Sequence, residues 1–125
     1  MAASALGVLL RYLREERRFS LRELAGFADI DHAYIYRLEV GEKESPSDEV
    51  VSKLAKVLKP DPRHFDMLRF LAQHPGANPD LTAYVMKEPS VTFDEFVPAA
   101  TVVHRGHTRP DPETLIKRVR KFLKG

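Results

Sequence analysis

The chain has 125 residues, enough for one good hydrophobic core, or for one compact module with a small appendage. No run approaches the roughly 18 consecutive apolar residues of a membrane span, and no basic segment precedes the apolar N-terminus, so neither a membrane protein nor a signal peptide is expected. Cysteine is absent, which excludes disulfides and thiolate metal sites and fits a cytoplasmic protein.

The net charge of +2 is small and unevenly spread. Residues 1–60 hold ten basic and ten acidic residues, whereas seven basic residues stand against two acidic ones from residue 105 onward. A neutral region binds nucleic acid only when its basic side chains share one face, and we then expect its non-specific affinity to be weak.

The first predicted helix covers residues 4–17. Its apolar face is formed by leucines at i, i+4 and i+7, namely Leu6, Leu10 and Leu13. The opposite face is expected to carry Arg11, Arg14 and Arg18.

Two short helices, at residues 21–28 and 32–40, are predicted on either side of a tight turn. Ser20 and Glu23 have the spacing of a capping box at the first helix. Ile30 is expected in the turn as a buried plug, and Asp31 can cap the second helix.

The second of these helices has a thin apolar stripe. Ile35 and Leu38 are expected to point inward. The side chains left outside are His32, Ala33, Tyr36 and Arg37. An exposed hydrogen-bonding face of this kind is typical of the second helix of a helix-turn-helix, which inserts into the major groove of DNA.

The rest of the chain also reads as helical. Gly41 ends the third helix, and a fourth runs to Leu58 from a cap at Ser45 or Ser47. Prolines break the chain at residues 60–62, and further helices are predicted from residue 62, at 79–87, from 92 and at 112–124. No strand pattern persists. We therefore expect an all-α protein with a helix-turn-helix DNA-binding domain at 1–60 and a helical dimerisation or partner-binding region at 61–125.

Residues 6–58 resemble the phage-repressor-like helix-turn-helix family, of the Cro/cI or XRE type. The segments that carry the resemblance are 6–20, 21–25, 34–41 and 47–58. The resemblance implies a five-helix domain whose fifth helix begins near Pro62. Three positions depart from the family pattern: Leu21 replaces a common phosphate-clamping Gln, Asp29 a common turn Gly, and His32 a common Arg or Gln.

Residues 89–125 are loosely similar to the tail of repressors that metalloproteases of the ImmA/IrrE type cut. That similarity implies a dimer interface in the tail and suggests cleavage near residues 103–105. An ordinary surface loop is the interpretation that we favour for this segment.

The candidate DNA-binding residues lie on and beside the third helix. His32 and Tyr36 offer hydrogen bonds to base edges, and Ala33 can touch a thymine methyl group. Arg37 and Tyr34 flank them and are better placed for phosphates. Further candidates for phosphate contacts are Arg14, Arg18 and Lys43. Lys43 is the best of these because loops after a recognition helix face the duplex; solvated surface charge is the plainer alternative for the other two.

The apolar residues of the last two helices are either core or dimer interface, or both. The candidate dimerisation residues are Phe93, Phe96, Val103, Leu115, Ile116, Val119, Phe122 and Leu123. A two-fold dimer would place its recognition helices on half-sites about 34 Å apart, one turn of DNA.

No motif indicates an enzyme or a cofactor. His104 and His107 lie near Asp111, but this spacing is common by chance, and we interpret the segment as a solvated loop rather than a metal site. The sequence therefore predicts a dimeric transcriptional repressor that reads a palindromic operator in double-stranded DNA. The alternative is an antitoxin that neutralises a partner toxin and autoregulates its promoter.

Overall fold

The computed structural model describes residues 3–102 and 110–124, which form eight α-helices and no strand. The helices are α1 (Ala5–Glu16), α2 (Leu21–Ala28), α3 (His32–Val40), α4 (Asp48–Leu58), α5 (Pro62–Gln73), α6 (Pro79–Met86), α7 (Phe93–Thr101) and α8 (Pro112–Leu123). The predicted all-α fold class is confirmed. None of the helices described is long and apolar enough to cross a membrane.

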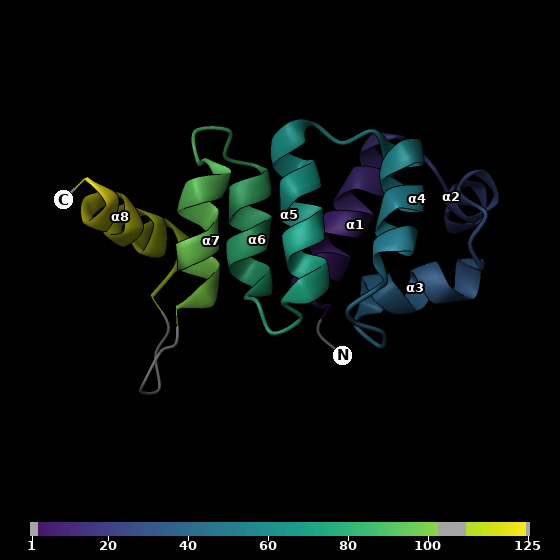
Figure 1. Ribbon diagram of the computed structural model, residues 1–125, viewed down its shortest axis with the longest axis horizontal. Coiled ribbons are helices and arrows are strands. Elements are labelled where there is room, and N and C mark those ends of the chain that lie inside the picture. The colour runs from purple at the N-terminus through teal and green to yellow at the C-terminus, as the bar shows by residue number, and fades with distance from the viewer. Residues whose placement is uncertain (1–2, 103–109, 125) are drawn as a thin grey trace.

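The helices are arranged side by side along the long axis of the molecule (Figure 1). One end holds α2 and α3, and the other end holds α8. Between them, α1 packs against α3 on one side and against α5 and α6 on the other. The first helix is therefore shared by the N-terminal and C-terminal halves of the chain.

The core is one continuous cluster that draws on all eight helices described and on the segments beside them. In the N-terminal half it contains the fully buried side chains of Leu9, Leu10, Leu24, Ile35 and Leu38. In the C-terminal half it contains Met67, Leu71, Leu81, Phe96 and Ile116. The apolar stripes that define the helices in the sequence thus meet in a single interior.

The helix caps follow the local sequence. The capping box of Ser20 and Glu23 is present, and the Asp31 carboxylate accepts a hydrogen bond from the backbone N–H of Ala33 at 3.1 Å. Ser47 caps α4, which decides between the two serines considered for that role. Asp29, at φ 56°, takes the left-handed conformation expected in the turn after α2.

Several expectations fall on residues 103–109, which lie outside the described residues. They are the dimer role of Val103, the loop character of His104 and His107, and the cleavage near residues 103–105. Asp111 is described, and it caps α8 through a hydrogen bond from the N–H of Thr114 at 2.8 Å.

Two side chains are placed differently from the sequence prediction. Arg14, expected on the solvent-exposed face of the first helix, has a side chain only 13% exposed because it pairs with a buried carboxylate. Ile30 is half-buried against the core rather than a fully buried plug.

Candidate nucleic-acid interface

The helix-turn-helix unit is formed by α2, a three-residue turn and α3. The two helices pack against each other, and Ala25 and Leu24 of α2 are buried in the contact region. The turn closes through backbone hydrogen bonds from Asp29 and Ile30 to the carbonyl of Ala25. The small side chain at Ala25 and the left-handed residue at Asp29 together permit the sharp change of direction.

The outer surface of α3 is available to a ligand. Ile35 and Leu38 are fully buried, whereas His32 and Arg37 are exposed and Tyr36 is 50% exposed. Ala33 and Tyr34 are half-buried, and Tyr34 packs against the core. One helix therefore presents two aromatic donors and a cation outward from a rigid, buried stripe. The contacts that the sequence analysis assigns to these side chains, with bases and phosphates of DNA, remain predictions.

A buried ion pair anchors the C-terminal end of α3 to α1. Arg14 donates from Nε and Nη2 to the two carboxylate oxygens of Glu39, at 2.7 and 2.9 Å, and from Nη1 to the carbonyl of Phe19 at 2.8 Å. The hydrogen bonds to Glu39 raise the pKa of Arg14 above its ordinary value. Arg14 thus holds the C-terminal end of α3 against α1, and this pairing was not recognised in the sequence.

A glycine allows α1 and α3 to approach closely at the same place. A Cβ atom added to Gly7 would lie 2.7 Å from the carbonyl oxygen of Leu38, and it would collide with the carbonyl of Glu39. Real side chains do not tolerate such distances to backbone atoms. Gly7 and Arg14 therefore fix α3 by packing and by charge.

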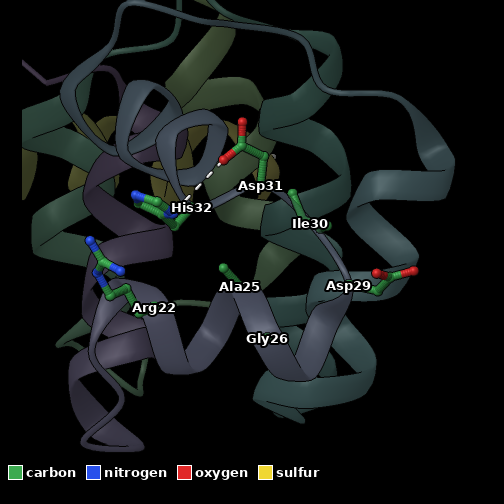
Figure 2. Close-up of a pocket in the computed structure, with 7 residues that line it drawn as sticks. All are labelled: Arg22, Ala25, Gly26, Asp29, Ile30, Asp31 and His32. Atoms are coloured by element: carbon green, nitrogen blue, oxygen red, sulfur yellow. Dashed lines mark ion pairs between the residues drawn. The ribbon is translucent and has the colours of Figure 1, made fainter.

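An open groove of about 480 Å³ runs between α2 and the start of α3 (Figure 2). Its lining residues are Arg22, Ala25, Gly26, Asp29, Ile30, Asp31 and His32. Arg22 was not among the predicted site residues. The sequence could have indicated Arg22 as a candidate, because it is a basic residue at the second position of the helix that precedes the turn.

The other predicted phosphate contacts lie at the surface. Arg18 is exposed just beyond the end of α1, with φ 57°. Lys43 is exposed in the turn after α3, where its backbone N–H donates to the carbonyl of Arg37 at 3.1 Å. Their roles toward DNA remain predictions.

The seven predicted dimerisation residues that the structure describes differ in burial. Four of them are buried within the chain: Phe96, Leu115, Ile116 and Val119. Phe93 is half-buried and packs edge-on against Phe70, with ring centroids 6.2 Å apart. Among the described members of the set, only Phe122 and Leu123 are openly exposed, at 81% and 52%.

The fold and this surface define a helix-turn-helix protein. In this class of protein, the second helix of the motif, which corresponds to α3 here, enters the major groove of DNA. The family described as a helix-turn-helix domain matches residues 5–68, about half of the chain, and the chain belongs to that family.

Among curated proteins, the chain is similar to the HTH-type transcriptional repressor RghR of Bacillus subtilis (strain 168), with 38% identity over 55 residues. The alignment covers 44% of this chain and 41% of that protein, so the chain matches less than half of its relative's length.

Proposed function

We propose that this protein is a sequence-specific, DNA-binding transcriptional repressor that binds as a dimer to a palindromic operator. The observation that carries the proposal is the exposed polar face of α3, held on the buried side chains of Ile35 and Leu38. The family match and the repressor named among its relatives support the same function.

Recognition divides between bases and backbone. His32 and Tyr36 carry the base contacts, because they point outward from one face of α3. Lys43 lies one turn beyond the helix and contacts phosphate, which adds affinity without sequence preference.

The test is selection of bound sequences from a random duplex library, followed by affinity measurements with two variants. We expect Tyr36→Ala to weaken binding of the selected operator by about 1–3 kcal/mol and to relax base choice. Lys43→Ala should weaken selected and random duplexes alike and reduce the salt dependence. Unchanged operator affinity in a folded Tyr36→Ala variant would contradict the assignment of α3.

We propose that the dimer forms through the tip of α8. The apolar stripe of α8 is covered by α6 and α7 as far as Val119 and then continues uncovered to Phe122 and Leu123. Burying such a side chain contributes about 1.5–3 kcal/mol, so two from each protomer give about 6–12 kcal/mol. Association costs about 4–15 kcal/mol, so a dimer of this size is weak in solution and forms mainly on DNA.

The position of α8 sets the spacing of the operator. Packed helices connect the two ends of the molecule in the order α3, α1, α6 and α8 (Figure 1). At about 8–10 Å for each packed pair, the seven steps between the recognition helices of an extended dimer span about 56–70 Å. This favours half-sites two turns apart, about 68–72 Å, over the one-turn spacing first expected from the sequence.

The dimer is tested with Phe122→Ser and Leu123→Ser combined, which changes only exposed side chains. Light scattering on the operator complex should give two protomers for the unchanged chain and one for the double variant. Two protomers in both cases would place the interface elsewhere.

The same exposed tip also suits a partner protein, which is the observation that favours the antitoxin alternative. Co-purification with a small protein encoded beside this one, and loss of that partner in the double variant, would support it.

A regulatory protease acting near residues 103–105, as the tail resemblance implies, would act by separating α8 from the rest of the chain.

A further inference from the structure

One large apolar side chain on the surface takes part in none of the contacts proposed above. Phe27 of α2 is 64% exposed, and among the described residues only Phe122 is a more exposed large apolar side chain. Phe122 and Tyr36 already have proposed partners, a second protomer and DNA. Phe27 has none, although exposing an aromatic ring to water has a free-energy cost.

Phe27 forms a small aromatic patch with Phe19. The centroids of the two rings are 5.3 Å apart, and the rings are tilted by 53°. Phe19 is half-buried against the core, and its carbonyl accepts a hydrogen bond from Arg14 Nη1 at 2.8 Å. A ring that is already held in place loses little conformational entropy when another surface covers it. The aromatic patch is therefore preorganised for a contact.

The aromatic patch lies away from the surface proposed to bind DNA. The groove between α2 and α3 is lined by Arg22, Ala25 and Gly26 of α2, but not by Phe27. At 3.6 residues per turn, Phe27 is about 100–140° round the helix axis from Arg22 and Gly26. A duplex in contact with α3 thus leaves the aromatic patch uncovered.

The charged groups beside the aromatic patch favour a second copy of this chain as its occupant. Arg18 directly precedes Phe19, Glu23 lies one helical turn before Phe27, and both charged side chains are exposed. In a two-fold contact the same surfaces meet reciprocally, so Arg18 of each copy can face Glu23 of the other. This contact would replace the phosphate contact considered for Arg18. The surface is therefore complementary to itself in charge as well as in apolar character.

The area of the aromatic patch is too small to hold two copies together in free solution. At 64% exposure, an aromatic side chain of about 150–250 Å² leaves about 100–160 Å² uncovered. Two such rings bury about 200–320 Å² against each other, whereas a stable interface buries about 1,200–2,000 Å². The contact therefore needs DNA to hold the two copies side by side, where their effective concentration is high.

We propose that the aromatic patch joins neighbouring dimers on adjacent operators, through a two-fold contact between the α2 helices of two copies. The inference rests on the proposed function. In the extended dimer proposed above, α8 lies at the centre, and α2 lies at the end of the molecule opposite α8 (Figure 1). The two α2 ends therefore face outward along the DNA, where the next dimer binds.

The same contact sets the spacing between the two operators. Helices α2 and α3 pack against each other within each chain, and the proposed contact adds one packed pair between the two α2 helices. At about 8–10 Å for each of these three pairs, the recognition helices of the two copies are about 24–30 Å apart. One turn of DNA, about 34–36 Å, is the nearest spacing that places both helices on the same face of the duplex.

The experiment compares a duplex that carries one selected operator with a duplex that carries two, whose neighbouring half-sites are one turn apart. We expect the unchanged chain to bind the second operator about 5–150-fold more tightly once the first is filled, the usual range for coupling between two sites. Phe27→Ser should reduce this factor to about one and leave the affinity for a single operator unchanged. Moving the two operators apart by about five base pairs, half a turn, should also reduce the factor to about one, because the copies then lie on opposite faces of the duplex.

Val102→Ser is the matched control, because Val102 is an exposed apolar side chain outside α2, and it should leave the factor unchanged. An equal factor in Phe27→Ser and in the unchanged chain would overturn the proposal. Loss of single-operator binding by a folded Phe27→Ser variant would also overturn it, since Phe27 would then belong to the operator contact.

Two further results separate this inference from the proposed function. If the unchanged chain binds a single operator but shows no preference for the second, the proposed function stands. A second copy is then excluded as the occupant of the aromatic patch, which is left to a different protein. If the unchanged chain selects no operator from the random library, the proposed function and this inference are both wrong.

Discussion

Replacing Arg14 with methionine should destabilise the protein far more than an ordinary surface substitution. The change removes two hydrogen bonds to Glu39 and one to the carbonyl of Phe19. The Glu39 carboxylate, whose side chain is 5% exposed, is then left buried without its partner. An unpaired buried charge of this kind costs about 3–5 kcal/mol.

The same helix offers a matched control. Arg11 pairs with Glu15 at 3.6 Å, but their side chains are 65% and 59% exposed. Exposed pairs contribute about 0.2–1 kcal/mol, so Arg11→Met should change the free energy of unfolding by no more than that.

The assay is urea denaturation followed by circular dichroism, for both single variants and for Arg14→Met combined with Glu39→Met. The double variant should recover much of the lost stability, because two apolar side chains replace the pair. A loss below 1 kcal/mol in Arg14→Met, equal to that of Arg11→Met, would refute the structural role assigned to the pair.

Two further predictions concern helix packing and acid stability. Gly7→Ala should lower the free energy of unfolding by about 1–3 kcal/mol, because the added methyl group is overpacked against the carbonyl of Leu38, even though alanine favours a helix by about 1 kcal/mol. The same variant should weaken DNA binding, because it displaces α3. A melting temperature above that of the unchanged chain would contradict this prediction. The hydrogen bond from Arg120 lowers the pKa of Glu95 in the folded protein. The stability that this pair gives to α8 is therefore fully present above the pKa of about 4.3 that Glu95 has in the unfolded chain. It is lost as the pH falls through the lower pKa of the folded protein. Arg120→Ala should flatten the pH dependence of unfolding below about pH 4, and an identical pH profile in the variant would exclude this role for the pair.

The local features of the fold were predictable because their causes lie within a few residues. The capping box of Ser20 and Glu23 spans three positions, and the breaks at proline and glycine follow from backbone sterics. The bounds of α2 and α3 were predicted correctly for this reason.

The features that the sequence concealed depend on contacts between distant segments. Arg14 and Glu39 are 25 residues apart, and nothing in either neighbourhood indicates that the two side chains meet. The apolar stripe of α8 is regular to its end, so periodicity alone did not show that α6 and α7 cover Leu115 but not Phe122. The groove at Arg22 likewise required the crossing of two helices to be known.

The central claim, that α3 lies in the major groove of DNA, is tested most directly by DNA cleavage from a tethered iron chelate. The chain has no cysteine, so His32→Cys provides a single attachment point at the start of α3, and Lys121→Cys provides a control on α8. With the selected operator, the chelate on residue 32 should cut within each half-site, at positions facing the major groove, and the chelate on residue 121 should leave those positions uncut. Equal cutting from both positions, or none from residue 32 on a duplex that the labelled protein still binds, would contradict the account.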